Sequence, residues 1–256
     1  FALQIEQFIS HFPLPVDAKR YNTILIIPEG SAGEIRPTCS HYRRRQWPGS
    51  GFGASFRRQR RAGCLYRHPD VLINNAGIAS GGDVLEAPIS EWRQLWEVNV
   101  LSVVRGTKLF LPAMLKRGSG HVVSTASFAG LAGAPGLMTY GVSKAAVVAF
   151  SEQLRAECHG TGVDVSVICP AFFKTNLMQS TVGTEKIKHL GQKMMDRSPD
   201  SLDHVADRIF ADINKRRFLI IPTKNEPMLW RIKRFFPSWY FRELIKRAGD
   251  MQLRLK

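Results

Sequence analysis

The stretch from residue 120 to residue 157 constrains the fold more than any other, because it specifies a strand, a turn and a helix in order. Residues 120–126 are apolar and β-branched and follow glycines, which predicts a short strand that ends at Ser127. The Gly- and Pro-rich residues 130–136 predict a turn, and residues 138–157 carry apolar positions at helical spacing. This order is typical of open α/β folds, in which ligands bind outside the carboxyl ends of the strands.

Tyr140 and Lys144 lie four residues apart near the start of the predicted helix, so the phenol and the ammonium share one helix face. A free tyrosine titrates near ~10, which is too high for a base at neutral pH. A neighbouring ammonium favours the phenolate and lowers the pKa of the tyrosine toward the range in which acid–base catalysis works best. The spacing therefore makes Tyr140 a candidate catalytic base. The alternative is an ordinary amphipathic helix with a lysine that extends to solvent.

Residues 91–115 are apolar along most of their length and predict a helix that is buried against the sheet. Asn99 is the polar exception within this helix. A buried amide needs hydrogen-bond partners, which it can find in a structural role or in a proton relay. Taken alone, Asn99 is better explained by a structural role.

Together with the NNAG tetrapeptide at 74–77, these residues resemble the short-chain dehydrogenase/reductase family over about residues 71–223. VLINNAG matches the motif of that family's fourth strand, and ICPAFFKT at 168–175 is similar to the loop after its sixth strand, with Ala171 in place of the usual glycine. The family's catalytic tetrad is matched by Asn99, Ser127, Tyr140 and Lys144. The resemblance implies a Rossmann-like, doubly wound parallel sheet in a single domain.

The resemblance also implies an NAD(P)-dependent oxidoreductase that transfers a hydride between the nicotinamide and an alcohol or ketone. Tyr140 would be the general acid/base, and Lys144 would lower the pKa of Tyr140 and bind the nicotinamide ribose. Ser127 would hold the substrate carbonyl, and Asn99 would support a water that links Lys144 to solvent. Further cofactor contacts would come from Asn74, Ala76, Gly77, Pro170 and Thr175. The resemblance implies a homodimer or homotetramer.

The composition fits a single enzyme domain. A chain of 256 residues with 44% hydrophobic content is long enough to bury one large core. The cysteines lack metal-ligand spacing, so we expect no metal site, free thiols and a reducing, cytoplasmic location. We expect no apolar run long enough to span a bilayer, and the first residues lack the basic-then-apolar order of a signal peptide.

The net charge of +15 is unevenly distributed along the chain. Residues 71–214 contain 13 basic and 13 acidic side chains and are therefore neutral. The excess lies in residues 1–70, with 11 basic and 5 acidic side chains, and in residues 215–256, with 12 basic and 3 acidic ones. Because the catalytic core is neutral, we do not expect a nucleic-acid partner.

Residues 23–27, TILII, predict a first buried strand, after which a dinucleotide fold needs a glycine-rich turn. Where the family has T-G-x-x-x-G-x-G, this chain has PEGSAGEI, in which Gly30 and Gly33 are the remaining candidates for phosphate binding. Glu29 or Glu34 would repel a pyrophosphate at this position. NAD and NADP are not distinguished, because the residue that selects between them belongs to the second strand, which is not recognisable here.

Residues 36–67 have nine arginines and no lysine, acidic residue, Ile, Val or Met, and they fit neither a helical nor a strand period. Their interleaved aromatic residues would suit nucleic-acid binding. High charge and low hydrophobicity would equally suit a disordered insertion. We favour a third hypothesis, out-of-frame translation or rearrangement of the reading frame, because the composition changes abruptly and regular patterning resumes at Asp70-Val71.

These patterns divide the chain into a catalytic domain at 21–225, with 28–70 atypical, and a basic, aromatic-rich extension at 226–256. Residues 201–224 predict a helix and a last strand, FLIIP. Residues 228–251 mix aromatic and basic side chains, as do segments that lie at an anionic membrane interface. We favour the alternative that this segment packs on the protein's own substrate site or on a second subunit.

The loop after Thr175 corresponds to the substrate lid of the family, and its apolar residues suggest a lipophilic alcohol or ketone: Met178, Leu190, Met194 and Met195. They could equally be core residues of a short helix. Two functions remain open at this point. The intact tetrad favours an oxidoreductase, and the degraded glycine motif favours a catalytically dead relative or a binding protein.

Overall fold

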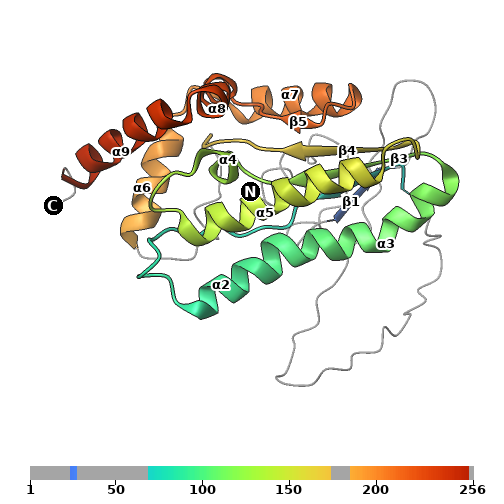
Figure 1. Cartoon of the computed structure of the whole chain (residues 1–256), viewed down its shortest axis with the longest axis horizontal. Coiled ribbons are helices and arrows are strands. Elements are labelled where there is room, and N and C mark those ends of the chain that lie inside the picture. The colour runs from blue at the N-terminus through green and yellow to red at the C-terminus, as the bar shows by residue number, and fades with distance from the viewer. Residues whose placement is uncertain (1–23, 28–68, 174–184, 254–256) are drawn as a thin grey trace.

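The computed structural model describes residues 24–27, 69–173 and 185–253 (Figure 1). Within them the strands are β1 Ile24–Ile27, β2 Val71–Asn74, β3 Gly120–Thr125, β4 Val163–Ile168 and β5 Leu219–Ile220. The helices are α2 Ile89–Leu95, η2 Trp96–Leu101, α3 Ser102–Arg117, α4 Ala129–Ala132, α5 Met138–Glu157, α6 Glu185–Asp196, α7 Leu202–Asn214, α8 Glu226–Phe235 and α9 Pro237–Leu253. The strand and helix predicted between residues 120 and 157 are both present, and α5 has the predicted bounds.

The sheet has the order β1-β2-β3-β4-β5, and strands β2 to β5 are parallel. Val71 pairs with His121 at the start of β2, and Asn74 pairs with Ser124 at its end. Parallel strands need crossover connections, which the helices between them provide. The predicted α/β class with a parallel sheet is confirmed for these strands.

Strand β1 departs from the predicted topology because it pairs antiparallel with β2. Ile24 lies opposite Asn74 and Ile27 lies opposite Val71. The carboxyl end of β1 is therefore at the edge where the parallel strands begin. In a dinucleotide fold the first strand is parallel, and its carboxyl end leads into the phosphate-binding turn. The expectation that residues 23–27 form the first parallel strand is wrong in direction.

The parallel strands send alternate side chains to two opposite faces, as expected for strands that are buried on both sides. On one face, Ile73 and Val123 belong to a cluster that includes Val205 and Ile209 of α7. On the other face, neighbouring strand residues cluster with side chains of α3 and α5: Leu72, Val122, Met114 and Leu154. Figure 1 shows α3 and α5 together on one side of the strands and α7 on the other.

Residues Ile89–Arg117 form one 29-residue helical run that is long and apolar enough to cross a membrane. The sequence-based expectation that no apolar run is long enough to span a bilayer is therefore wrong, because this helix has both the length and the apolar composition that a span needs. A helix that covers a sheet in a folded protein can be equally long and apolar, and α3 contacts β2 and β3, with Met114 buried against Leu72 and Val122. The run contains the π-helical segment η2, a distortion that often occurs at functional sites.

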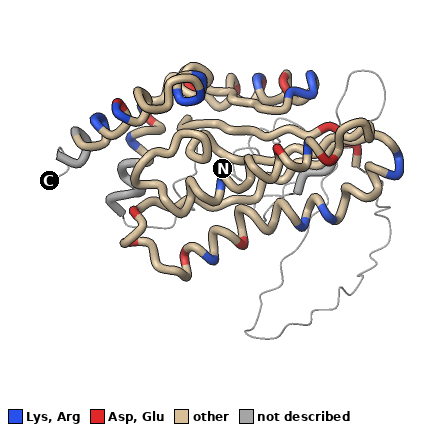
Figure 2. Tube along the Cα trace, in the orientation of Figure 1, with Lys and Arg blue, Asp and Glu red and all other residues tan. Residues whose placement is uncertain are grey.

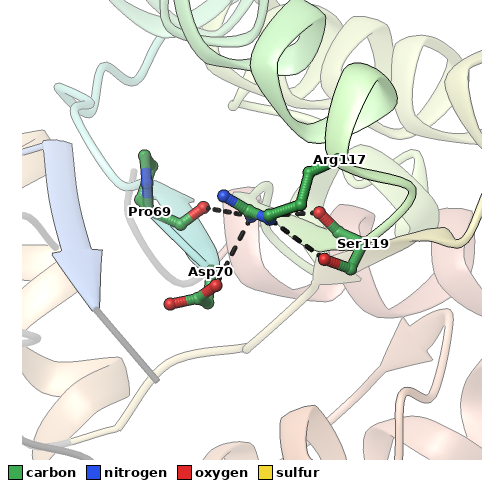
Figure 3. Close-up of polar contacts among 4 residues, drawn as sticks. All are labelled: Pro69, Asp70, Arg117 and Ser119. Carbon is green, nitrogen blue, oxygen red and sulfur yellow. Dashed lines mark hydrogen bonds and ion pairs between the residues drawn. The ribbon is translucent and has the colours of Figure 1, made fainter. Parts of the chain in front are cut away.

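Arg117 connects the end of α3 to the beginnings of β2 and β3 (Figure 3). Its guanidinium donates to the Pro69 carbonyl at 2.9 Å and to the Ser119 carbonyl at 3.0 Å, and it lies 3.4 Å from a carboxylate oxygen of Asp70. The helix ends where Gly118 adopts φ 70°, the left-handed conformation that favours glycine after a helix. These contacts hold the amino-terminal edge of the sheet, opposite the edge where the candidate site lies.

The extension forms two helices, α8 and α9, which contact each other. Lys233 hydrogen-bonds the Leu131 carbonyl, and the Tyr240 hydroxyl donates to the Ala132 carbonyl at 3.1 Å. These carbonyls belong to the last residues of α4, where helix carbonyls lack partners within the helix. The inner face of the extension therefore packs on the segment between Ser127 and Tyr140.

Candidate active site

Tyr140 and Lys144 lie one turn apart on α5, and both side chains are buried. The Lys144 ammonium lies 6.0 Å from the centroid of the Tyr140 ring. It donates a hydrogen bond of 2.9 Å to the carbonyl of Thr125, the last residue of β3. The predicted pair is thus placed where β3 ends, but the hydrogen bond of the ammonium is with the strand rather than with the phenol.

The backbone beside Lys144 leaves little room for larger residues. A Cβ added at Gly77 would lie 3.0 Å from Lys144 Nζ and 3.4 Å from Asn99 Oδ1. A Cβ added at Gly130 would lie 2.6 Å from the Lys144 carbonyl carbon, so α4 can approach α5 this closely only without a side chain. Gly77 and Gly130 therefore permit the packing that surrounds the lysine.

Burial controls the acidity of the pair. Burial raises the pKa of Tyr140 to about 12, although a hydrogen bond with the Ser127 side chain acts in the opposite direction. Burial also lowers the pKa of Lys144 to about 8, because the apolar surroundings disfavour the ammonium. The lowered pKa expected for Tyr140 from its lysine neighbour is wrong, because desolvation by burial is the largest influence on the phenol and raises its pKa.

Ser127 lies just beyond β3, as predicted, and its side chain faces Tyr140. Its hydroxyl donates to the Pro170 carbonyl at 3.4 Å and accepts from the Ala129 amide at 3.2 Å. The Phe128 amide also donates to the Pro170 carbonyl, at 2.8 Å. The loops after β3 and β4 are therefore tied together at the carboxyl edge of the sheet, where the family resemblance expects a substrate.

Asn99 is fully buried within η2, and its amide is satisfied by protein groups. Its Oδ1 accepts from the Ile78 amide at 2.8 Å, and its Nδ2 donates to the Ile78 carbonyl at 3.0 Å. Nδ2 also donates to Ser143 Oγ at 2.9 Å, and Ser143 donates to the Tyr140 carbonyl at 2.8 Å. These contacts support the structural role considered for Asn99, and they join the loop after β2 to α5.

The last residue of β2, Asn74, and the following Ala76 and Gly77 lie at the carboxyl edge of the sheet, and all three are buried. Asn74 donates to Thr107 at 3.3 Å, while its Oδ1 and the Oδ1 of Asn75 have no hydrogen-bond partner. Thr125 Oγ1 is also buried without a partner. Buried polar atoms of this kind call for a partner, so this edge fits a polar ligand such as the ribose and amide groups of a nicotinamide dinucleotide.

Some sequence-predicted residues do not join this arrangement. Gly30, Gly33 and Thr175 lie outside the described residues, as do the hypotheses about residues 36–67. Met195 is buried in the core beside Val205, so it is a core residue rather than part of a substrate wall. Met194 is exposed.

Sequence reasoning missed Thr125, Ser143 and Cys169. Two of them could have been found from their distance along the chain to predicted site residues. Thr125 precedes Ser127 by two residues on the same strand end, and Ser143 follows Tyr140 by three residues on the same helix. Cys169 follows β4 directly, and burial raises the pKa of its thiol to about 12 although Lys144 acts in the opposite direction. Its closeness to Lys144 depends on the pairing of β3 with β4, which no local pattern reveals.

Comparisons with known proteins identify the family of the chain. The family model described as short chain dehydrogenase matches residues 60–186. Dehydrogenase/reductase SDR family member 7B of Danio rerio is 32% identical over 185 residues, which are 71% of this chain and 59% of that protein. The chain thus spans somewhat more than half the length of this curated relative.

Two solved structures share the fold. A short-chain dehydrogenase/reductase of Burkholderia phymatum, solved in complex with NAD, is 28% identical with a TM-score of 0.57, over 73% of this chain and 67% of that chain. A short-chain dehydrogenase of Streptomyces avermitilis is 26% identical with a TM-score of 0.58, over 72% of this chain and 71% of that one. The motifs, the parallel sheet and these similarities agree, and the chain belongs to the short-chain dehydrogenase/reductase family.

Proposed function

We propose that this protein is an NAD(P)-dependent oxidoreductase that interconverts an alcohol and a ketone, with Tyr140 as the general acid/base. The observation that carries the proposal is that Ser127, just beyond β3, and the buried Tyr140 and Lys144 of α5 meet at the carboxyl edge of the sheet, with the Lys144 ammonium 6.0 Å from the centroid of the Tyr140 ring. The family membership and the NAD complex of the Burkholderia phymatum relative support a nicotinamide cofactor. The buried atoms of Asn74, Asn75 and Thr125 that lack partners support a polar ligand at the same edge.

The side chains divide the work by their protonation states. Tyr140 has a pKa near 12 and is neutral at pH 7, so its hydroxyl is ready to donate a proton to a ketone oxygen. Ser127 would orient that oxygen by a second hydrogen bond. In the oxidation direction Tyr140 must accept a proton, and a charged Lys144 would favour the phenolate that this requires. When bound, the nicotinamide ring would supply or accept the hydride.

The residues proposed to hold the cofactor lie on both sides of this pair. Lys144 would bind the nicotinamide ribose, and Asn74, Ala76 and Gly77 would line the adenosine-ribose side. Pro170 follows β4, and its carbonyl accepts from Ser127, so it is near the proposed nicotinamide end. Thr175 would contact the carboxamide. Asn99 would hold the loop after β2 against α5 and support a water near Lys144.

A second candidate function is favoured by the direction of β1. Because β1 is antiparallel to β2, its carboxyl end lies away from the edge that carries Ser127 and Tyr140. A glycine turn directly after β1 would begin at the wrong edge to hold a pyrophosphate beside Asn74. This observation supports a catalytically dead relative that retains the tetrad but binds no dinucleotide.

Titration with NADH and with NADPH, followed by nicotinamide fluorescence, separates the two functions. The oxidoreductase proposal expects saturable binding of at least one cofactor, and it fails if neither binds. Turnover of a panel of ketones by the wild type and by Tyr140→Phe then tests the acid/base. Removal of a general acid/base costs roughly 10² to 10⁴ in rate, with cofactor affinity little changed.

Tyr240→Phe is a matched control, because Tyr240 is as buried as Tyr140 and its hydroxyl contacts the Ala132 carbonyl. This variant should keep most of the turnover. Equal losses in the two variants would indicate that the hydroxyl of Tyr140 has no special role in the reaction.

The substrate that we propose is a lipophilic alcohol or ketone, supported by the exposed apolar side chain of Met194 on α6. We also propose a homodimer or homotetramer in a reducing, cytoplasmic location. The free thiols of Cys158 and Cys169 support the reducing environment.

A further inference from the structure

The extension α8–α9 has an inner face that is fixed to the protein. Leu229 and Trp230 pack against a core cluster that contains Phe128 and Ala132. Tyr240 and Lys233 hydrogen-bond the carbonyls at the end of α4. The orientation of the two helices is thereby set, so their opposite face is presented to the surroundings in a defined way.

The turn between the two helices carries large apolar side chains with no cover in the described structure. Phe235 and Phe236 are 69% and 65% exposed, and Trp239 is 46% exposed. Met228 and Ile245 are exposed on the flanking helices. Single exposed apolar residues are ordinary, but three exposed aromatic residues within five positions form a patch that requires a partner.

Cations share the faces that carry these apolar residues. On α8, Met228, Arg231 and Phe235 follow one another at helical spacing, and on α9 the same spacing joins Trp239, Arg242 and Lys246. Their basic side chains are exposed. Figure 2 shows lysine and arginine along both helices. An apolar aromatic patch bordered by cations matches the interface of an anionic bilayer, where rings lie at the headgroup level and cations meet phosphates.

A second copy of this chain fits the patch less well. A symmetric contact brings the same surface from both subunits together. Such a contact would place Arg231, Arg242 and Lys246 of one subunit close to the same cations of the other. Residues 226–249 contain six basic and two acidic side chains, so few acidic groups are available to balance the repulsion.

We propose that the outer face of α8–α9 is a docking surface for anionic membranes. Phe235, Phe236 and Trp239 enter the headgroup region, and Arg231, Arg242 and Lys246 bind lipid phosphates. Because the inner face of α8–α9 holds α4, the carboxyl-edge site lies near the bilayer surface, where a lipophilic substrate is concentrated. The docking itself does not depend on the proposed oxidoreductase activity.

Co-sedimentation of the full chain with vesicles tests the proposal. The wild type should bind vesicles of phosphatidylcholine with about one third phosphatidylserine, and it should bind pure phosphatidylcholine far less. The triple variant Arg231→Gln, Arg242→Gln, Lys246→Gln should bind the anionic vesicles about a hundredfold more weakly, at ~1 kcal/mol per cation. A matched control replaces the exposed lysines Lys108, Lys116 and Lys193 by Gln and should retain binding.

The aromatic patch is tested separately by the double variant Phe235→Ser, Phe236→Ser. The control is the double variant Leu85→Ser, Leu109→Ser, which removes exposed apolar side chains elsewhere on the surface. Only the first pair should lose binding. The tryptophan emission of the wild type should shift to shorter wavelength with anionic vesicles, and the shift should be smaller in Trp239→Phe. Absence of vesicle binding by the wild type, or equal binding by the triple variant and its lysine control, would overturn the proposal. A wild-type dimer that the Phe235 and Phe236 substitutions dissociate would instead assign the patch to a second copy.

Discussion

The Lys144 ammonium donates to the Thr125 carbonyl at 2.9 Å, while it lies 6.0 Å from the centroid of the Tyr140 ring. Helical spacing alone places the lysine beside the tyrosine, but β3 supplies the hydrogen-bond partner. A buried ammonium needs such a partner, and the carbonyl at the end of the strand offers an acceptor there. Lys144 therefore ties α5 to the end of β3.

The free energy of unfolding should rise at alkaline pH through Lys144. Burial lowers its pKa from the ordinary 10.5 of a lysine to about 8 in the folded protein, so between these two values the unfolded chain binds more protons than the folded one. Stability therefore increases as pH rises through this window, and between pH 7 and pH 9.5 the gain is about 2 kcal/mol. Urea unfolding at both pH values should show this gain in the wild type. Lys144→Met should show a smaller gain, and an identical gain would contradict the assignment.

His121 should make the protein sensitive to acid. Its ring is buried, and its Nε2 lies 2.7 Å from Ser166 Oγ. The Ser166 hydroxyl donates its proton to the Arg217 carbonyl, so Nε2 must be the donor to Ser166. The Nδ1 atom of His121 has no hydrogen-bond partner. Burial lowers the pKa of His121 from 6.5 to about 3, so the unfolded chain binds the extra proton as pH falls below 6.5. Stability should therefore fall by about 2 kcal/mol from pH 7 to pH 5.

Chemical unfolding of His121→Asn at the two pH values checks this expectation. The variant will be less stable at pH 7, because it loses a buried ring, but its further loss at pH 5 should be smaller than that of the wild type. His159→Asn is the control, because His159 is exposed. An undiminished acid loss in His121→Asn would assign the acid sensitivity to other groups.

Gly77→Ala should impair activity more than stability. The new Cβ would lie 3.0 Å from Lys144 Nζ, which is the far end of a flexible side chain and can move at small cost. Displacement of the ammonium by about 1 Å can reduce turnover by up to ~10². Steady-state kinetics and thermal unfolding of the same preparation separate the two effects. Gly249→Ala, where the added Cβ meets nothing within 4 Å, should leave turnover unchanged.

Gly130→Ala should destabilise the fold itself. Its Cβ would lie 2.6 Å from a backbone carbon of Lys144, so α4 and α5 must move apart. Overpacking of this kind costs about 1–3 kcal/mol. Gly141→Ala is the matched control within α5, because its Cβ would meet the Ala129 carbonyl at an ordinary 3.5 Å. Equal melting temperatures of the two variants would show that α4 adapts without strain.

Much of the site could be predicted because its signals are local. The bounds of α5, the place of Ser127 at the end of β3 and the turn between them follow from periodicity, β-branched residues and glycine, which act over a few positions. The partners of Asn99 could not be predicted, because Ile78 and Ser143 come from segments 21 and 44 residues away. The same holds for the core position of Met195, which depends on the long-range packing that brings it into one cluster with residues of β2, β3 and α7.

The sequence by itself determined the family, the order of the elements around the tetrad and the identity of the four candidate catalytic residues. Only the tertiary structure decided that β1 is antiparallel, because strand direction depends on the partner strand rather than on the apolar pattern of residues 23–27. It also decided that burial raises the pKa of Tyr140, because desolvation depends on every group packed around the ring. The spacing of Tyr140 and Lys144 identifies the pair in the sequence, and the surrounding fold determines the charge that each side chain carries.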